Sequence, residues 1–155
     1  MDQPRWLDDD EQRAWRRLAA VILKLPSELE AQLQRDSGMS HFEYWVIALL
    51  SEAPDRTLRL SHLAAQANAS LSRVSHVASR LETRGWIDRR HSPDDARATL
   101  AVLTDAGWEQ VVAAAPGYVE AVRRFVFDAL TPHDIHELAR ICDAILAQLD
   151  GRPQG

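Results

Sequence analysis

The sequence has almost no cysteine and no long hydrophobic run. Cys142 is the only cysteine among 155 residues, so no disulfide can form within the chain, which is typical of a protein in a reducing compartment. No stretch approaches the roughly 18 apolar residues that a membrane-spanning helix needs. The start of the chain, MDQPRWLDDDE, has neither the basic nor the apolar segment of a secretory signal. We therefore expect a soluble, cytoplasmic protein with no membrane partner.

The sequence also lacks the motifs of common enzymes. It contains no glycine-rich phosphate-binding loop and no nucleophile elbow, so we expect neither enzymatic activity nor a cofactor. Of the six histidines only His133 and His136 are close at helical spacing, and the exposed start of a helix explains them better than a metal site. Cys142 falls on the apolar stripe of a predicted helix, which favours a buried small hydrophobe over a redox sensor.

Positive charge is lacking overall but not locally. The formal net charge is −5, which by itself argues against a nucleic-acid-binding protein. However, residues 70–99 contain six arginines and only four acidic residues, a local balance of +2. Phosphate binding requires positive charge at the contact face and not over the whole molecule. This basic segment is therefore where we expect contacts with double-stranded DNA.

The N-terminal part of the chain is predicted to be helical. Apolar residues recur at spacings of three and four over 8–36, as in an amphipathic helix. Pro26 should kink or restart this helix, with Ser27 and Glu30 as the new cap. The segment DSGMS should end it, and a second helix, capped by Ser40, should follow.

Residues 55–104 have the pattern of a winged helix-turn-helix. The triplet LRL over 58–60 is predicted to add one strand to a small sheet, and Ser61 to cap a short helix. A longer helix over 71–84 follows, and two extended runs around the turn HSPDD predict a β hairpin. The predicted fold class is mainly α with a small antiparallel β wing.

The complete chain is predicted to be one compact domain in three parts. Residues 1–54 supply a dimerisation helix and the second helix, 55–104 the DNA-binding region, and 105–155 two further dimerisation helices, the first weakened at APG. The flanking helices carry more apolar surface than a centre of about 50 residues can cover. The economical interpretation is that they pair with the same helices of a second copy, which gives a homodimer.

The helix over 71–84 has the two faces of a DNA-recognition helix. Short polar and basic side chains on the outer face of such a helix can reach base edges and phosphates in the major groove. An ordinary solvated face would have a similar composition, whereas a winged helix that binds protein would present apolar anchors there. The side chains predicted to face the core are Leu71, Val74, Val77, Ala78 and Leu81. The DNA contacts predicted from this region are Ser70, Ser72, Arg73, Ser75, His76 and Arg80.

The hairpin turn RRHSPDDARA, residues 89–98, carries both charge signs. An arginine at the tip of a wing can enter the minor groove, where negative potential is concentrated, and Arg97 is placed for this role. A carboxylate two residues earlier, Asp95, could hold its guanidinium in one direction. Arg89 and Arg90 should lie near phosphates. The alternative is a surface turn with an ion pair of little energetic value.

The stretch 71–107 resembles the signature of the MarR family of transcriptional regulators. The matching elements are RLE-x-x-G-x-I-x-R over 80–89, D-x-R over 95–97 and LT-x-x-G over 103–107. The resemblance implies a homodimer that binds a pseudo-palindromic DNA operator, commonly as a repressor, with Arg97 at the wing tip and Asp95 as its partner. Ala96 departs from the pattern, because relatives often have a basic residue there, and this implies a lower wing affinity.

The resemblance also implies release from DNA by a small, often aromatic, molecule. The family's usual pocket lies between the dimerisation helices and the DNA-binding lobe. The residues predicted to line it are Trp15, His41, Trp45 and Arg59. Packing in the core or in the dimer interface would also explain both tryptophans. The operator sequence, the effector and the choice between repression and activation stay open at this point.

Overall fold

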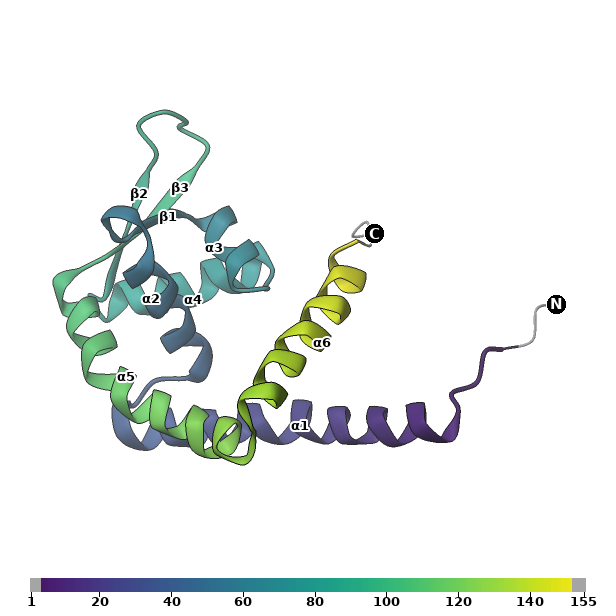
Figure 1. The fold of residues 1–155 in the computed structure, drawn as a ribbon. Coiled ribbons are helices and arrows are strands. Elements are labelled where there is room, and N and C mark those ends of the chain that lie inside the picture. The colour runs from purple at the N-terminus through teal and green to yellow at the C-terminus, as the bar shows by residue number, and fades with distance from the viewer. Residues whose placement is uncertain (1–3, 152–155) are drawn as a thin grey trace. The chain divides into compact units, whose positions relative to one another are not determined.

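The computed structural model describes residues 4–151, which form six α-helices, a three-stranded sheet and two short 3-10 helices (Figure 1). The chain divides into two compact units, the first ending at Tyr118 and the second beginning at Val119. The mainly α architecture with an antiparallel β wing confirms the predicted fold class. None of the described helices is long and apolar enough to cross a membrane. The elements in chain order are α1 (Asp9–Ser37), α2 (His41–Glu52), η1 (Pro54–Arg56), β1 (Thr57–Arg59), α3 (Leu60–Gln66), α4 (Leu71–Thr83), β2 (Ile87–His91), β3 (Thr99–Leu103), α5 (Asp105–Phe125), η2 (Phe127–Ala129) and α6 (Pro132–Asp150).

α1 is a single helix of 29 residues that continues through Pro26. The predicted restart at this proline is wrong: the Ser27 hydroxyl caps no new helix and donates instead to the carbonyl oxygen of Leu23, at 3.4 Å. The lost main-chain hydrogen bond does not break the helix, because Leu29 and Leu33 bury its C-terminal part in the core.

The junctions on either side of α2 and β1 show where capping signals succeed and fail. Gly38 ends α1 with a φ of 63°, and Ser40 and Glu43 form a capping box at the start of α2, both as predicted. The predicted cap at Ser61 is wrong, because α3 begins at Leu60 and no side chain caps it. The pairing of β1 with β3 carries the chain straight into α3 and leaves no loop in which a cap could form.

The three strands are ordered β1–β3–β2 and pair antiparallel throughout. β2 and β3 form the predicted hairpin, β1 adds the predicted third strand, and the turn between β2 and β3 projects as the wing (Figure 1). Gly107 ends the LT-x-x-G motif and lies so close to the carbonyl of Trp86 that any side chain there would clash. This motif therefore packs the start of α5 directly against the chain entering the wing.

The core of the first unit includes the inner face of α4. The buried residues of this helix are Val74, Val77, Ala78 and Leu81, as predicted. Leu71 differs from the prediction, because 53% of it is exposed. It is the first residue of α4 and lies one turn before the residues that pack into the core. The spacing of the apolar residues is right, but it does not show where the core ends.

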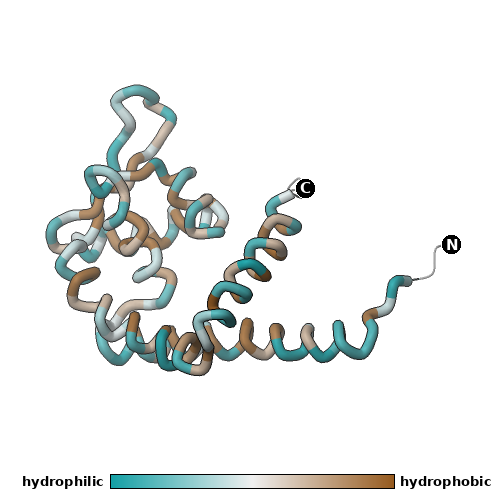
Figure 2. The backbone as a smooth tube through the Cα atoms, viewed as in Figure 1, coloured by the Kyte–Doolittle hydropathy of each residue, from teal (hydrophilic) through white to brown (hydrophobic). Residues whose placement is uncertain are grey.

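Two helices keep apolar stripes exposed in the single chain. None of the described residues of α6 is buried, although apolar residues recur along it (Figure 2). Cys142 lies on this stripe and is exposed, so its predicted burial is wrong for the single chain. The residue spacing identified the apolar stripe correctly, but nothing within residues 4–151 of the single chain covers it. The large apolar side chains exposed on α1 are Trp15, Leu18, Val21, Ile22 and Leu23, and those on α6 are Ile135, Leu138, Ile141, Ile145, Leu146 and Leu149.

Candidate DNA-binding surface and ligand cleft

Apart from Leu71, the outward face of α4 is polar over its first two turns. The Ser70 hydroxyl accepts a hydrogen bond from the main-chain nitrogen of Arg73, at 3.1 Å, and so caps the helix. Ser72 and His76 are exposed, and Ser75 is partly exposed. Because the N-terminal residues of a recognition helix contact base edges, these three side chains are well placed for direct contacts.

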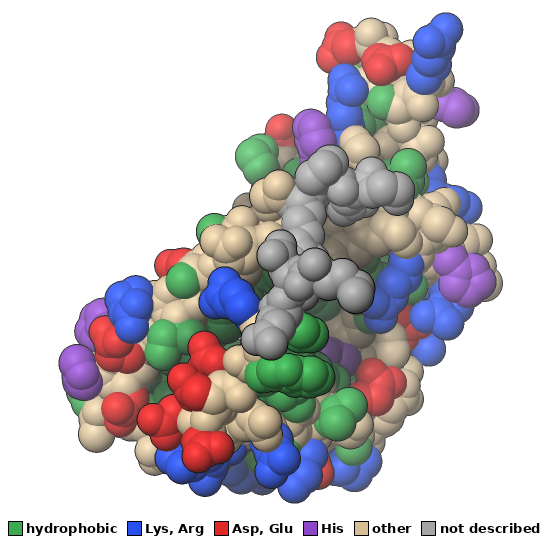
Figure 3. Space-filling view, turned by 90° about the vertical axis from the view of Figure 1, so that its right-hand side faces the viewer, with side chains coloured by type: hydrophobic (Ala, Val, Ile, Leu, Met, Phe, Trp, Pro, Cys, Tyr) green, Lys and Arg blue, Asp and Glu red, His purple; other side chains and the backbone are tan. Residues whose placement is uncertain are grey.

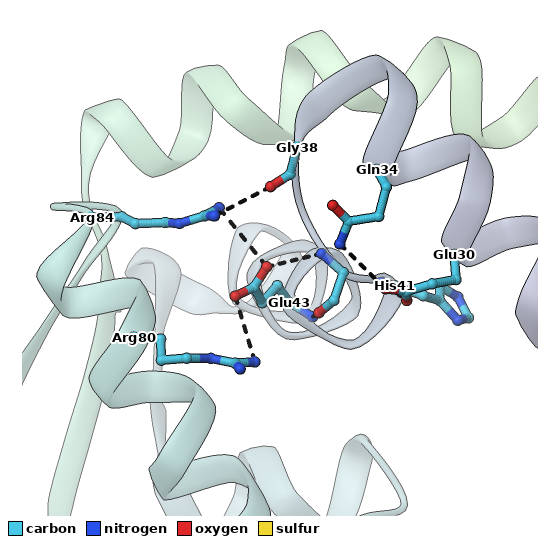
Figure 4. Close-up of polar contacts among 8 residues, drawn as sticks. Glu30, Gln34, Gly38, His41, Glu43, Arg80 and Arg84 are labelled. Carbon is cyan, nitrogen blue, oxygen red and sulfur yellow. Dashed lines mark hydrogen bonds and ion pairs between the residues drawn. The ribbon is translucent and has the colours of Figure 1, made fainter.

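The two arginines of α4 are held against α2. The guanidinium carbon of Arg73 lies 4.0 Å from the centre of the Phe42 ring, a cation–π contact. Arg80 Nη2 lies 3.5 Å from Glu43 Oε1 (Figure 4). Both arginines remain exposed, so each can approach a phosphate from a position that α2 sets.

Glu43 is the buried acid at this junction, with 8% of its side chain exposed. Its Oε2 accepts a hydrogen bond from the main-chain nitrogen of Ser40, at 2.9 Å, and lies 3.8 Å from Arg84 Nη1. Arg84 also donates to the carbonyl oxygen of Gly38, at 3.2 Å (Figure 4). Together with Arg80, these contacts pair the buried charge on both oxygens and tie the first turn of α2 to the C-terminal end of α4.

The two arginines on β2 have acidic neighbours. Arg89 donates to Glu82 from its side chain, at 3.2 Å, and from its main chain, at 2.9 Å. These hydrogen bonds lower the pKa of the Glu82 carboxyl, the side-chain bond most of all. Arg90 Nη2 lies 3.4 Å from Asp88 Oδ2. Ion pairs near the surface contribute little energy, so both arginines are available to phosphates.

The tip of the wing differs from the prediction, because Asp95 does not hold the Arg97 guanidinium. Its Oδ1 accepts a hydrogen bond from the main-chain nitrogen of Arg97, at 3.0 Å, and its Oδ2 lies 3.7 Å from Arg59 Nη1. In this tight turn the carboxylate faces the main chain two residues on. Arg97 is exposed and takes part in none of the ion pairs found within residues 4–151. Acidic and basic side chains are displayed together at the wing tip (top of Figure 3).

A groove of about 260 Å³ lies between the wing and the N-terminal turn of α4. Arg59 lies in this groove and does not line the cleft around His41 and Trp45, so its predicted place beside those two residues is wrong. The groove brings Ser75 of α4 close to Arg97 of the wing, which are two of the predicted DNA contacts. Its lining consists of Arg59, Leu60, Ser61, Leu71, Ser75, Arg97, Ala98 and Thr99.

A larger cleft, of about 460 Å³, lies within the first unit. His41 and Trp45, two of the four residues predicted to contact a ligand, line it. Trp15 is 55% exposed on α1 and does not line it. The complete lining is Pro26, Glu30, His41, Phe42, Trp45, Ala67, Arg73 and Tyr118.

The cleft combines aromatic rings with a few polar groups. His41 Nε2 lies 3.1 Å from Tyr118 Oη, and the His41 main-chain nitrogen donates to Glu30 Oε2, at 2.7 Å. Burial lowers the pKa of the His41 imidazole, and the charge of Glu30 opposes this shift in part. Burial also raises the pKa of the Tyr118 hydroxyl. At pH 7 the cleft therefore presents a neutral imidazole and a neutral phenol, together with the Glu30 carboxylate and one cation, Arg73.

Tyr118 and Arg73 are the polar side chains of this cleft that pack against its aromatic residues, and neither was predicted from the sequence to line it. Tyr118 follows the segment APG, which the sequence marks as a weak point, yet α5 continues through Pro116 and brings Tyr118 to His41. The sequence pattern assigns Arg73 to the DNA-facing surface only. Its contact with Phe42 depends on how α2 packs against α4, and residue spacing carries no signal for that packing.

The chain is similar to known regulators over nearly its whole length. The family model of the MarR family matches residues 39–99. Sco3205, a MarR family transcriptional regulator from Streptomyces coelicolor solved in complex with DNA, is 42% identical, with a TM-score of 0.93 over 99% of this chain and 95% of its own. AbsC, a MarR family regulator from the same organism, is 37% identical, with a TM-score of 0.91 over 96% of this chain and 100% of its own.

A more distant relative agrees with these two. The transcriptional repressor MprA of Escherichia coli (strain K12) is 24% identical over 123 residues, which is 79% of this chain and 69% of that protein. The two Streptomyces structures match in fold and in sequence over almost the complete chain. The chain belongs to the MarR family of transcriptional regulators.

Proposed function

We propose that this protein binds a pseudo-palindromic DNA operator as a homodimer and represses transcription until a small aromatic ligand releases it. The observation that carries the proposal is the shared groove between α4 and the wing, with Ser75 on one wall and Arg97 on the other. A recognition helix in the major groove and a wing arginine in the adjacent minor groove would straddle one DNA strand in this way. The DNA complex of Sco3205 supports this proposal.

The side chains divide into groups by the contact that each can make. Ser72, Ser75 and His76 face outward near the start of α4 and would contact base edges. Arg89 and Arg90 on β2 would bind phosphates, which position the protein but read no sequence. The remaining predicted contacts lie at the edges of this surface. Ser70 caps α4, and Arg73 and Arg80 would reach DNA from positions that their contacts with α2 set. Asp95 holds the turn of the wing, and Arg97 would enter the minor groove.

A second copy of the chain would cover the exposed apolar stripes. The N-terminal half of α1 and the whole of α6 expose side chains such as Ile22, Ile141 and Ile145, which a stable monomer would bury. In the proposed homodimer, residues 1–54 and 105–155 supply these helices. Ile141→Glu should yield monomers in light scattering, and Ala147→Glu, on the opposite face of α6, should remain dimeric. Equal dimer content in both variants would contradict this arrangement.

Release by a ligand would act through Arg73, because this residue belongs to the recognition helix and also lines the cleft. An aromatic acid that pairs with Arg73 would compete with its contact to Phe42 and shift the start of α4. Repression is supported by the name of the relative MprA, which is a transcriptional repressor.

The DNA-binding proposal is tested with an operator obtained by in vitro selection. Arg97→Ala should weaken binding. It should also reduce the slope of log affinity against log salt concentration by about one per half-site, because one positive charge near the phosphates is lost. Arg35→Ala, an exposed arginine on α1, is the matched control and should bind like the parent protein. Unchanged affinity of Arg97→Ala at every salt concentration would contradict the proposed binding mode.

A further inference from the structure

The first residue of α4 is an apolar side chain on an otherwise polar surface. Leu71 is 53% exposed, whereas Val74 and Val77 of the same helix are at most 3% exposed. Its neighbours in the chain are Ser70 and Ser72. No other large apolar side chain of α4 is exposed within the described residues, so Leu71 is an isolated contact point and not part of an apolar docking patch.

Leu71 lies beside residues that the proposed function places on DNA. It lines the same groove as Ser75 and Arg97, at the N-terminal turn of α4. In helix-turn-helix proteins the N-terminal residues of the recognition helix contact base edges in the major groove. A leucine has no hydrogen-bonding group, so it can read only an apolar feature of a base edge.

The major groove offers one such feature, the C5-methyl group of thymine. We propose that Leu71 reads a thymine methyl in each half-site of the operator, as a specificity-determining residue. This inference rests on the proposed function, since it requires α4 to lie in the major groove. Contact between the two apolar groups removes both from water, which favours thymine over a base that lacks the methyl group. Because Leu71 does not pack into the core, the fold without DNA does not depend on this side chain.

The test compares thymine with uracil, which forms the same base pair but lacks the methyl group. Operators selected with the parent protein are synthesised with uracil in place of each thymine of the half-site in turn. At one of these positions, uracil in one half-site should lower the affinity of the parent about fourfold, the value expected for one methyl group. Uracil in both half-sites should lower it about fifteenfold. Leu71→Ala should bind the thymine and uracil operators equally, and Leu71→Met should regain the preference for thymine.

The outcomes separate this inference from the proposed function. Folding of Leu71→Ala is checked by its melting temperature, which should match that of the parent because the side chain is exposed. Equal binding of thymine and uracil operators by the parent would overturn the role of Leu71, as would an unchanged thymine preference in Leu71→Ala. Both results leave operator binding intact. Failure of the parent to bind any selected DNA would overturn the proposed function, and this inference with it.

Discussion

Asp95 connects the wing to the strand that leads into the helix-turn-helix, because its Oδ2 lies 3.7 Å from Arg59 Nη1. Its other oxygen accepts the main-chain hydrogen bond from Arg97. The carboxylate therefore fixes the backbone of the wing tip relative to β1 and leaves the Arg97 side chain free to extend. The direction in which the wing presents Arg97 is set by Arg59, a residue 38 positions earlier in the chain.

The first prediction concerns Asp95→Ala. Loss of both contacts should lower operator affinity about fivefold, since one hydrogen bond of about 1 kcal/mol no longer orders the wing. Electrostatics alone predicts the opposite, because removing a negative charge beside DNA raises affinity. Asp94→Ala makes the same change of charge at a side chain without an ion pair in the described part of the chain. Fluorescence anisotropy titrations at one salt concentration should show weaker DNA binding for Asp95→Ala only. Equal affinities of the two variants would refute the role of Asp95 in ordering the wing.

A second prediction concerns the buried carboxylate of Glu43. Glu43→Ala should lower the free energy of unfolding by about 2 kcal/mol, because Arg80 and Arg84 lose their shared partner and α2 loses half of its capping box. Glu52→Ala, an exposed position in the same helix, should change it by less than about 0.5 kcal/mol. Urea denaturation at fixed protein concentration measures both. A loss below 0.5 kcal/mol for Glu43→Ala would show that the network does not stabilise the fold.

A third prediction follows from the lowered pKa of His41. In the unfolded chain this imidazole takes up a proton near pH 6.5, whereas in the folded cleft it does so only at lower pH. The free energy of unfolding should therefore fall as the pH drops below about 6.5, because protons then favour the unfolded state. His41→Gln should show a smaller fall between pH 7.5 and 5.5, and His62→Gln, an exposed control, should match the parent. Identical pH profiles for parent and His41→Gln would contradict the burial of the imidazole.

A fourth prediction separates the two tryptophans. Benzoate, as an aromatic acid probe, should raise the melting temperature of the parent in a concentration-dependent way if it occupies the cleft beside Arg73. Trp45→Ala should lose more than half of this rise, because Trp45 lines the cleft. Trp15→Ala should keep all of it, because Trp15 lies elsewhere on α1. Equal shifts in all three proteins would remove the cleft as the ligand site.

Local patterns in the sequence predict the elements of this fold well. The capping box at Ser40, the stop at Gly38 and the hairpin around HSPDD are set by neighbouring residues, and the structure has all three. Predictions that depend on what a residue meets from elsewhere in the chain fare less well. Leu71 lies beyond the end of the core, although its spacing fits the buried stripe.

The candidate site shows the same limit. The sequence identifies the charged side chains of the wing, but it pairs Asp95 with the nearest arginine, whereas the sheet brings Arg59 to it. It identifies His41 and Trp45 from the resemblance, but Tyr118 and Arg73 join them only through helix packing. Contacts between residues far apart in sequence depend on register and packing geometry, which single-chain periodicity does not specify.

Three consecutive residues of α2 connect the cleft to both ends of α4. His41 lines the cleft, Phe42 lies under Arg73 of the recognition helix, and Glu43 pairs with Arg80 at its far end. A substitution that reshapes the cleft at 41 or 42 also changes a contact that supports α4, the helix proposed to bind DNA. Under the proposed function, a change at these positions would therefore alter the preference for a ligand and the choice of DNA site together. Variants that acquire a new ligand through the first turn of α2 should need a compensating change in α4 to keep their original DNA site.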